Sequence, residues 1–155
     1  MLRRVRGKRV MQQQIGFCST ADGVRIAYAT VGSGPALIFA QAFSHLGLEW
    51  EEPRVRDFWE TIGHHRMVVR YDTHGCGLSD RNRSDFSLDF EVRIIEAIVR
   101  DLELKSFVLW ARSYQAAAAI AYVIKYPDRV SHLILYGAQA RWHGVASRSS
   151  VSKET

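Results

Sequence analysis

Four short, mostly apolar runs constrain the fold of this chain more than any other feature of its sequence. They span residues 36–40, 66–71, 106–110 and 132–136. A run without regular polar alternation suits a strand covered on both faces, as in a parallel sheet. Apolar residues spaced three and four apart between the runs predict helices over 55–63, 87–102 and 114–126. This alternation predicts a mostly parallel sheet with helices on both faces.

The N-terminal part predicts an antiparallel hairpin ahead of this repeat. Segments 14–20 and 24–31 are expected to be strands, with Ala21-Asp22-Gly23 between them. An Asp-Gly pair between two extended segments is a strong hairpin signal, because glycine readily takes the positive φ of a tight turn. The expected fold class is therefore α/β, a mostly parallel sheet flanked by helices and preceded by an antiparallel hairpin.

The charge distribution divides the chain into three parts. Five of the 21 Lys and Arg lie within residues 1–10, and the remaining 16 equal the 16 Asp and Glu. We interpret 1–13 as a basic, flexible arm, 14–140 as the folded domain, and the serine-rich 141–155 as a disordered tail. No apolar run approaches the roughly 18 residues of a membrane span, and the basic start lacks the apolar region of a secretory signal. We expect a cytoplasmic protein without nucleic-acid or membrane partners.

The cysteine and histidine content predicts neither a metal site nor a cofactor. The two cysteines, Cys18 and Cys76, are too few and too isolated for a disulfide framework. The six histidines form no HxxxH or HExxH pattern, and the neighbouring His64 and His65 would diverge on a helix.

A serine follows the run 106–110 directly, in the segment Ala111-Arg112-Ser113-Tyr114-Gln115. Ligands bind beyond the carboxyl ends of the strands in open parallel sheets, so this loop is a candidate site. Ser113 lies where a sharp strand-to-helix turn would expose a nucleophilic hydroxyl. The glycines of a GxSxG pattern are absent, and a serine that caps an ordinary helix fits the position equally well.

A second candidate loop is Asp72-Thr73-His74-Gly75-Cys76-Gly77-Leu78-Ser79-Asp80, which follows the run 66–71. Asp72 and His74 could supply an acid and a base. The alternative is structural, with Gly75 and Gly77 making sharp turns. We favour structure over phosphate binding, because Asp80 stands where the third glycine of GxGxxG would be.

Four segments in order resemble the α/β-hydrolase fold family over residues 14 to about 140. DTHGCGLSD resembles its D-x-x-G-x-G-x-S motif, VGSGPALIFA its G-x-G-P and following strand, and YPDRVSHLILYG the stretch that leads into its sixth strand. The fourth is ARSYQ, at the position of the nucleophile turn. Two longer stretches look closest to bacterial hydrolase-like domains, some of them joined to adenylate cyclase or transcription-regulator domains. The resemblance implies a truncated α/β-hydrolase fold that extends through the sixth strand.

The resemblance assigns Ser113 as the nucleophile and implies an oxyanion hole made by the backbone N–H groups of Phe43 and Tyr114. It gives Asp72, Gly75, Gly77 and Ser79 structural roles. The sequence departs from the family at the glycines that flank the serine, which are Ala111 and Gln115 here, and at the His-Gly before the oxyanion residue, which is Gln41-Ala42.

The acid and histidine of the family's catalytic triad lie beyond the sixth strand. His132 is expected at the start of that strand, far from Ser113, while His143 and Glu154 lie in the predicted tail. The sixth strand is internal in the family, so here it would form an exposed apolar edge. Such an edge favours self-association.

Three functions remain open from the sequence. The first is a serine hydrolase of esters, amides or related small acyl compounds, incomplete and weakly active or inactive as this chain. The second is a non-catalytic ligand-binding or sensor module of a regulatory protein, which the replaced glycines favour. The third is a non-functional remnant, expected to be unstable.

Overall fold

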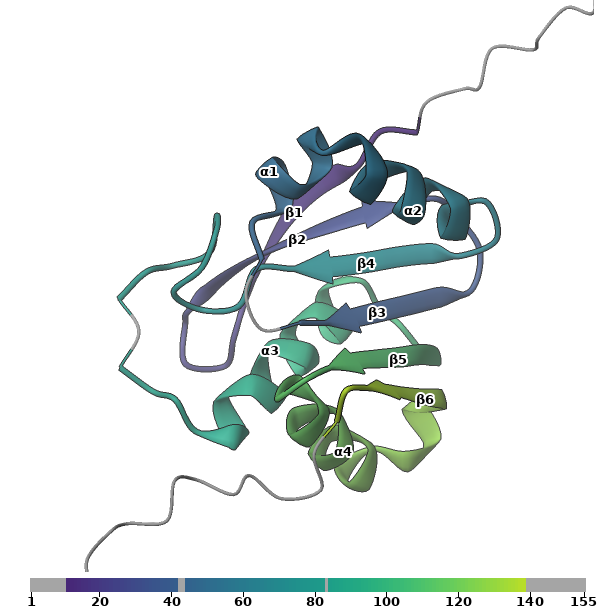
Figure 1. Cartoon of the computed structure of the whole chain (residues 1–155). Helices are drawn as coiled ribbons and strands as arrows, with labels where there is room; N and C mark the ends of the chain where they lie inside the picture. The colour runs from purple at the N-terminus through teal and green to yellow at the C-terminus, as the bar shows by residue number, and fades with distance from the viewer. Residues whose placement is uncertain (1–10, 42–43, 83, 139–155) are drawn as a thin grey trace, which may run out of the picture.

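The computed structural model describes residues 11–41, 44–82 and 84–138. Within them one sheet has the strand order β1-β2-β4-β3-β5-β6 (Figure 1). The strands are β1 (Gln14–Ser19), β2 (Arg25–Val31), β3 (Ala36–Ala40), β4 (Met67–Tyr71), β5 (Phe107–Arg112) and β6 (Val130–Tyr136). The helices are α1 (Leu46–Glu51), α2 (Pro53–Gly63), α3 (Leu88–Asp101) and α4 (Gln115–Lys125), and a 3₁₀ turn spans Pro127–Arg129.

The sheet confirms the predicted α/β class. β3 pairs in parallel with both β4 and β5, and β5 pairs in parallel with β6. β1 and β2 form the expected antiparallel hairpin, and β2 also pairs antiparallel with β4. Gly23 takes a φ of +87° in the hairpin loop, as the Asp-Gly signal indicates.

Helices cover both faces of the sheet, and the side chains of each strand divide between the two resulting cores. Leu37 and Phe39 of β3 pack with Trp59 of α2 in one core. Ile38, from the same strand, packs with the apolar residues of α3 and α4 in the other core. Because helices cover both of its faces, β3 is buried along its whole length and its sequence is apolar without alternation.

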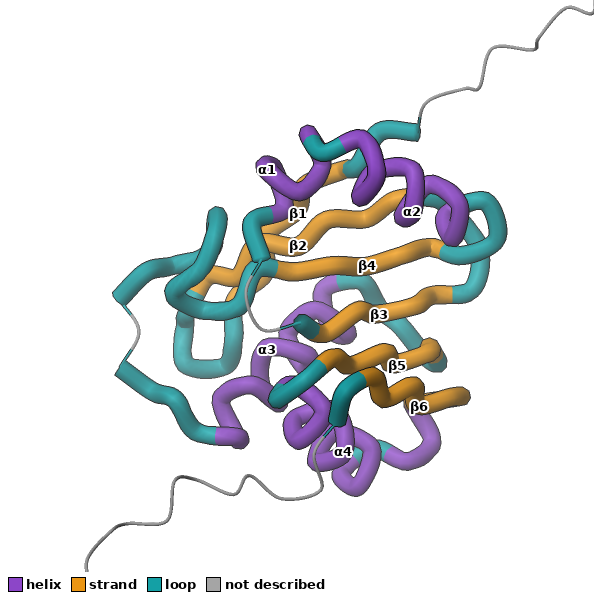
Figure 2. The backbone as a smooth tube through the Cα atoms, in the orientation of Figure 1, coloured by secondary structure: helices purple, strands orange, loops and turns teal. Residues whose placement is uncertain are grey.

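The two helical layers do not cover the sheet to the same extent. α2 contacts β2 and β4, whereas α4 contacts β3, β5 and β6. Figure 2 shows α1 and α2 over the half of the sheet that contains β1, β2 and β4, and no described helix over β5 and β6 on that side. The face of β6 on the α2 side is therefore open within the described residues, whereas Trp110 of β5 packs against Phe58 and Trp59 of α2.

One helix was not expected from the sequence. α1 is a six-residue helix whose N-cap is His45, with the imidazole Nδ1 accepting from the Leu48 N–H at 3.3 Å. Leu46 is fully buried, while the remaining residues of α1 show no long apolar periodicity. Tertiary contacts therefore supply most of what holds this short helix, since helices of this length are unstable alone.

The predicted limits of the domain, the flexible arm and the disordered tail stay predictions, because most of the residues concerned lie outside the described ranges. Met11 and Gln13 do contact the domain: the Met11 N–H donates to Glu60 Oε1 at 3.1 Å, and Gln13 Nε2 donates to the Leu46 carbonyl at 3.0 Å. None of the described helices is both long enough and apolar enough to cross a membrane. The cytoplasmic location stays a prediction.

β6 is an edge strand and is largely exposed. Ile134, Leu135 and Tyr136 are 44%, 41% and 64% exposed, and the strand carries no Lys, Glu or Pro. Charged and proline residues are the usual protection of a free edge against pairing with another chain. β1, at the opposite edge, also exposes an isoleucine, Ile15, at 40%.

We predict that the chain self-associates through β6, because its unprotected apolar edge can pair with the β6 of a second copy. Ile134→Lys is expected to shift the protein toward the monomer in sedimentation velocity over a concentration series. Ile15→Lys makes the same change at the β1 edge and serves as the control. Equal effects of the two substitutions, or a wild-type protein that is monomeric throughout, would contradict the prediction.

Candidate active site

Ser113 lies at the turn between β5 and α4 and has a φ of +58°, in the left-handed region that non-glycine residues rarely adopt. Such a backbone costs about 1–3 kcal/mol and persists only where its surroundings hold it. Two hydrogen bonds do so: the Ser113 N–H donates to the Tyr136 carbonyl at 2.9 Å, and the Ser113 carbonyl accepts from the Ala116 N–H at 3.1 Å. The residue is exposed at the carboxyl end of the sheet.

The two residues predicted to form an oxyanion hole have different outcomes. Tyr114 follows the turn as the N-cap of α4, so its backbone lies at the positive end of the helix dipole. Phe43 lies outside the described residues. The geometry of an oxyanion hole therefore stays a prediction.

Gln115 replaces a family glycine, and the structure buries it completely. Its Nε2 donates to Glu91 Oε2 on α3 at 2.9 Å, and the same carboxylate oxygen accepts from Thr73 Oγ1 at 3.0 Å. The longer side chain thus turns away from the strand, as the sequence analysis requires, and joins the turn at Ser113 to α3 and to the loop after β4. Ala111, at the other replaced glycine, is also fully buried and adds only a methyl group to the core.

Asp72 organises the loops at the carboxyl ends of β3 and β4. Its Oδ1 accepts from Ser44 Oγ at 2.8 Å and from the Leu46 N–H at 3.1 Å, while Oδ2 accepts from the Leu78 N–H at 2.8 Å. Gly77 has a φ of +49°, and a Cβ there would overlap the Asp72 carboxylate. These contacts support the structural role that the family resemblance gives to this loop.

Ser79, the last residue of that motif, connects the loop to β2. Its Oγ donates to the Asp72 carbonyl at 2.6 Å and accepts from the Ala27 N–H at 2.8 Å. The hydroxyl is buried and uses both its donor and its acceptor. It therefore closes the loop against the sheet.

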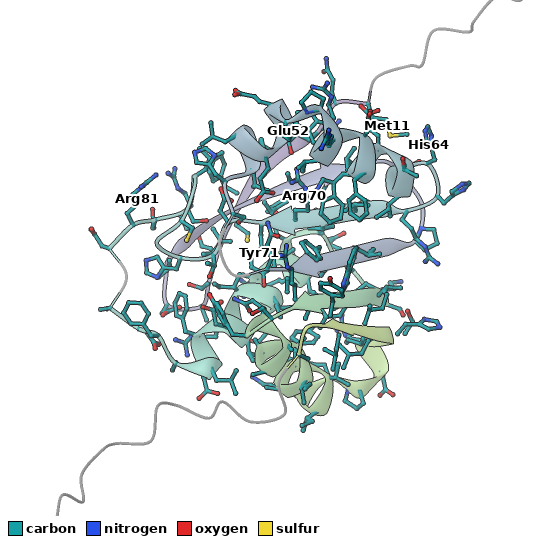
Figure 3. All side chains as sticks on the ribbon, in the orientation of Figure 1. Met11, Glu52, His64, Arg70, Tyr71 and Arg81 are labelled. Atoms are coloured by element: carbon teal, nitrogen blue, oxygen red, sulfur yellow. The ribbon has the colours of Figure 1, made fainter. Side chains whose placement is uncertain are left out.

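An ion pair between the buried Arg70 and the partly buried Glu49 holds α1 on the α2 side of the sheet. Arg70, labelled in Figure 3, projects from β4 and donates from Nη1 to Glu49 Oε2 at 2.9 Å. Its guanidinium also lies 5.2 Å from the ring centre of Trp59. Burial raises the pKa of Glu49 and lowers the pKa of Arg70, and in both residues the opposite charge of the partner opposes the shift.

The Glu49 carboxylate also contacts the segment before the predicted oxyanion residue. Gln41 Nε2 donates to Glu49 Oε1 at 2.9 Å. Gln41 stands where the family has histidine, and its side-chain amide donates to Glu49 of α1. The position of Gln41 therefore depends on the same ion pair that fixes α1.

No described histidine hydrogen-bonds to the Ser113 hydroxyl. His74 is 5% exposed and lies beside Phe90, with their ring centres 5.2 Å apart. His132 pairs with Val108 in the amino-terminal half of β6, about 13 Å along the strand from Tyr136 at about 3.3 Å per residue. Within the described residues the Ser113 side chain makes no hydrogen bond, and His143 lies outside them.

Sequence reasoning did not single out Glu91, Glu49 or Arg70. Two of them carried a usable signal: Glu91 lies three and four residues before Ile94 and Ile95 on the apolar face of α3, and Arg70 interrupts an apolar strand. A charged residue on a buried face has to be paired, so such positions predict buried polar networks. Glu49 carried no signal, because α1 itself was not predicted.

The sheet, the two helical layers and the exposed serine at a left-handed strand-to-helix turn define an α/β-hydrolase-type domain. A sequence model described as alpha/beta hydrolase fold matches residues 35–150. The chain belongs to the α/β-hydrolase fold family.

The chain is similar in sequence to proteins whose names describe different reactions. The chain is 26% identical over 130 residues to 2-hydroxy-6-oxo-2,4-heptadienoate hydrolase of Pseudomonas putida, which covers 81% of this chain and 45% of the relative. It is 34% identical over 73 residues to a proline iminopeptidase of Thermoplasma volcanium, which covers 45% of this chain and 24% of that protein. The chain thus spans less than half the length of either relative.

The chain also spans less than half the length of a similar solved structure. A hydrolase from Pseudomonas aeruginosa superimposes with a TM-score of 0.73 at 22% identity, over 85% of this chain and 48% of that one. At this identity the similarity shows the fold alone.

We predict that Gln115→Ala lowers the free energy of unfolding by about 1–3 kcal/mol, measured by urea denaturation. The buried Glu91 carboxylate keeps its hydrogen bond from Thr73 but loses the one from Gln115, and truncation of a fully buried side chain leaves a cavity. Removal of Gln115 Oε1, which has no hydrogen-bond partner among the described residues, offsets part of this cost. Alanine is the better helix former, so helix propensity cannot explain a loss. Gln12→Ala, at an exposed position, is the control and is expected to change stability little. Unchanged stability in Gln115→Ala would contradict the role assigned to this contact.

Proposed function

We propose that Ser113 is the nucleophile of a serine hydrolase that acts on esters, amides or related small acyl compounds. The observation that carries the proposal is the left-handed backbone of an exposed, non-glycine residue at the carboxyl end of the sheet. Strained residues of this kind concentrate at functional sites. A serine that merely capped α4 would not require this conformation, because N-cap residues ordinarily adopt extended backbone angles.

In this mechanism Ser113 Oγ attacks the carbonyl carbon, and a histidine accepts the hydroxyl proton. The negative charge that forms on the carbonyl oxygen is stabilised by the backbone N–H groups of Phe43 and Tyr114. The leaving group departs with the proton from the histidine, and water then hydrolyses the acyl-enzyme by the same steps. The described residues do not supply the histidine, so we expect weak turnover or none from this chain.

The experiment is therefore designed around covalent labelling as well as turnover. General-base assistance contributes about 10²–10⁴-fold, so a serine without its histidine reacts slowly. We predict slow labelling by a fluorophosphonate at a single serine, identified by mass spectrometry, and slow hydrolysis of p-nitrophenyl acetate. Ser113→Ala is expected to reduce both to the background rate.

Ser106→Ala is the matched control, because Ser106 is an exposed serine just before the amino end of β5. It is expected to leave labelling and hydrolysis unchanged. Labelling that persists in Ser113→Ala, or that is absent from the wild-type protein after long incubation, would argue against Ser113 as the nucleophile.

A non-catalytic ligand-binding or sensor module is the second candidate. The replacement of both flanking glycines by Ala111 and Gln115 favours it, together with a Ser113 hydroxyl that has no hydrogen-bond partner in the described residues. Saturable ligand binding that is unaffected by Ser113→Ala, in a protein whose Ser113 is not labelled by a fluorophosphonate, would distinguish this function from the first.

A further inference from the structure

Glu91 is a buried carboxylate in the first turn of α3. Its Oε2 accepts two hydrogen bonds, from Gln115 Nε2 at 2.9 Å and from Thr73 Oγ1 at 3.0 Å. Burial of a carboxylate is costly unless such bonds compensate it, although the first turn of a helix favours an acidic group. An apolar side chain at this position would avoid the cost, so packing alone does not account for Glu91.

Through Gln115, Glu91 holds one side of the turn that carries Ser113. Gln115 is the first residue of α4 and is fully buried. On the other side of the turn, the Ser113 N–H donates to the Tyr136 carbonyl of β6 at 2.9 Å. A left-handed backbone such as that of Ser113 persists only where its surroundings hold it. The bond from Gln115 to Glu91 therefore ties the helical side of the turn to α3.

Through Thr73, Glu91 also holds the loop after β4. Thr73 directly follows Asp72, whose Oδ1 accepts from Ser44 Oγ at 2.8 Å. Ser44 in turn follows Phe43, the residue predicted to supply an oxyanion donor. A continuous path of hydrogen bonds and adjacent residues thus runs from the segment of the predicted oxyanion donor to the nucleophile turn. Glu91 is the point at which the two halves of this path meet.

A second glutamate of α3 provides a comparison on the same helix. Glu96 Oε1 accepts from Lys125 Nζ at 2.8 Å and from Tyr126 Oη at 3.0 Å, so Glu96 also joins α3 to the α4 region. Its partners lie at the far end of α4, about 15 Å along the helix from Gln115 at 1.5 Å per residue. Loss of the Glu96 contacts would loosen the same pair of helices without releasing the nucleophile turn.

We propose that Glu91 is a positioning residue for Ser113, which fixes the nucleophile turn relative to the segment of the predicted oxyanion donor. The inference rests on the proposed serine-hydrolase function and deepens it. The attacking oxygen and the oxyanion donors have to be held in one geometry, and a misplacement of about 1 Å that originates far from the chemistry can slow a reaction about 100-fold. Glu91 acts through Gln115 and Thr73 and touches no substrate itself.

The first measurement is the rate at which a fluorophosphonate labels Ser113 in the full chain, with circular dichroism to verify that each variant is folded. Glu91→Leu leaves the donors of Gln115 and Thr73 without their acceptor, and is expected to slow labelling at least about tenfold. Glu91→Gln keeps a side-chain oxygen of the same reach, so it is expected to restore most of the wild-type rate. Glu96→Leu is the matched control and is expected to leave the rate unchanged.

Two further variants separate the two arms of the path. Thr73→Val removes only the hydroxyl that donates to Glu91, and is expected to slow labelling less than Glu91→Leu because Gln115 keeps its acceptor. Gln115→Gly removes the contact with the turn. In a Gln115→Gly background, Glu91→Leu is expected to have a smaller effect than in the wild-type chain, because residues that act through one contact are not additive.

The second measurement does not require the serine to react. The amides of Ser113 and Ala116 both donate hydrogen bonds within the turn, so their hydrogen exchange, followed by NMR, reports its geometry. Glu91→Leu is expected to accelerate exchange of these two amides relative to the amides of β1 and β2. Glu96→Leu is expected to leave the two amides as they are in the wild-type protein.

Equal slowing of labelling by Glu91→Leu and Glu96→Leu would overturn the proposal, as would an unchanged rate in Glu91→Leu or a Glu91→Gln rate as low as that of Glu91→Leu. If Glu91→Leu does not fold, an unchanged rate in Thr73→Val would overturn it. Absence of labelling from the wild-type protein would instead contradict the hydrolase function. Amide exchange would then decide whether Glu91 positions the turn, and unchanged exchange would refute that role.

Discussion

The buried carboxylate of Asp72 is the constraint on which the architecture around the candidate site depends. It lies at the end of β4 and receives hydrogen bonds from Ser44 and Leu46, which follow the neighbouring strand β3, and from Leu78 of its own loop. A buried charge is costly unless it is fully hydrogen-bonded, so these loops cannot move independently of it. The glycine at 77 lets the chain approach closely enough for this arrangement. The same network fixes the start of α1, through the N–H of its first residue.

Two further polar networks lie on opposite faces of the sheet and hold the ends of the functional loops. On the α3 side, Glu91 connects Gln115 and Thr73. On the α2 side, Glu49 connects Arg70 and Gln41. Burial raises the pKa of Glu49 and lowers the pKa of Arg70, against the attraction between the two charges. Such a pair is weak evidence for stability, because desolvation offsets the attraction. The pair connects β4 to α1 and, through Glu49, to Gln41, and removal of Glu49 would leave the buried Arg70 without its ion-pair partner.

The sequence predicts the parts of this fold that depend on local pattern. The apolar runs locate the central strands to within one or two residues, because strands covered on both faces cannot include many polar side chains. The insertion of β4 between β2 and β3 was not predicted, since strand order depends on contacts between distant segments. α1 was missed for a related reason: its short helix is held by Leu46 and Glu49 through contacts with the rest of the domain. At the site, the position of Ser113 followed from the strand–helix boundary, whereas the partner of Gln115 required the structure.

Gln115 shows what the family glycines contribute and what can replace them. The turn at Ser113 keeps its left-handed backbone although neither flanking residue is glycine. Ala111 fits because its methyl group is absorbed by the core, and Gln115 fits because a buried acceptor on α3 receives its amide. The left-handed turn is therefore a property of the residues that surround it and not of the glycines alone. The departure from GxSxG is consequently compatible with a nucleophilic serine at this turn.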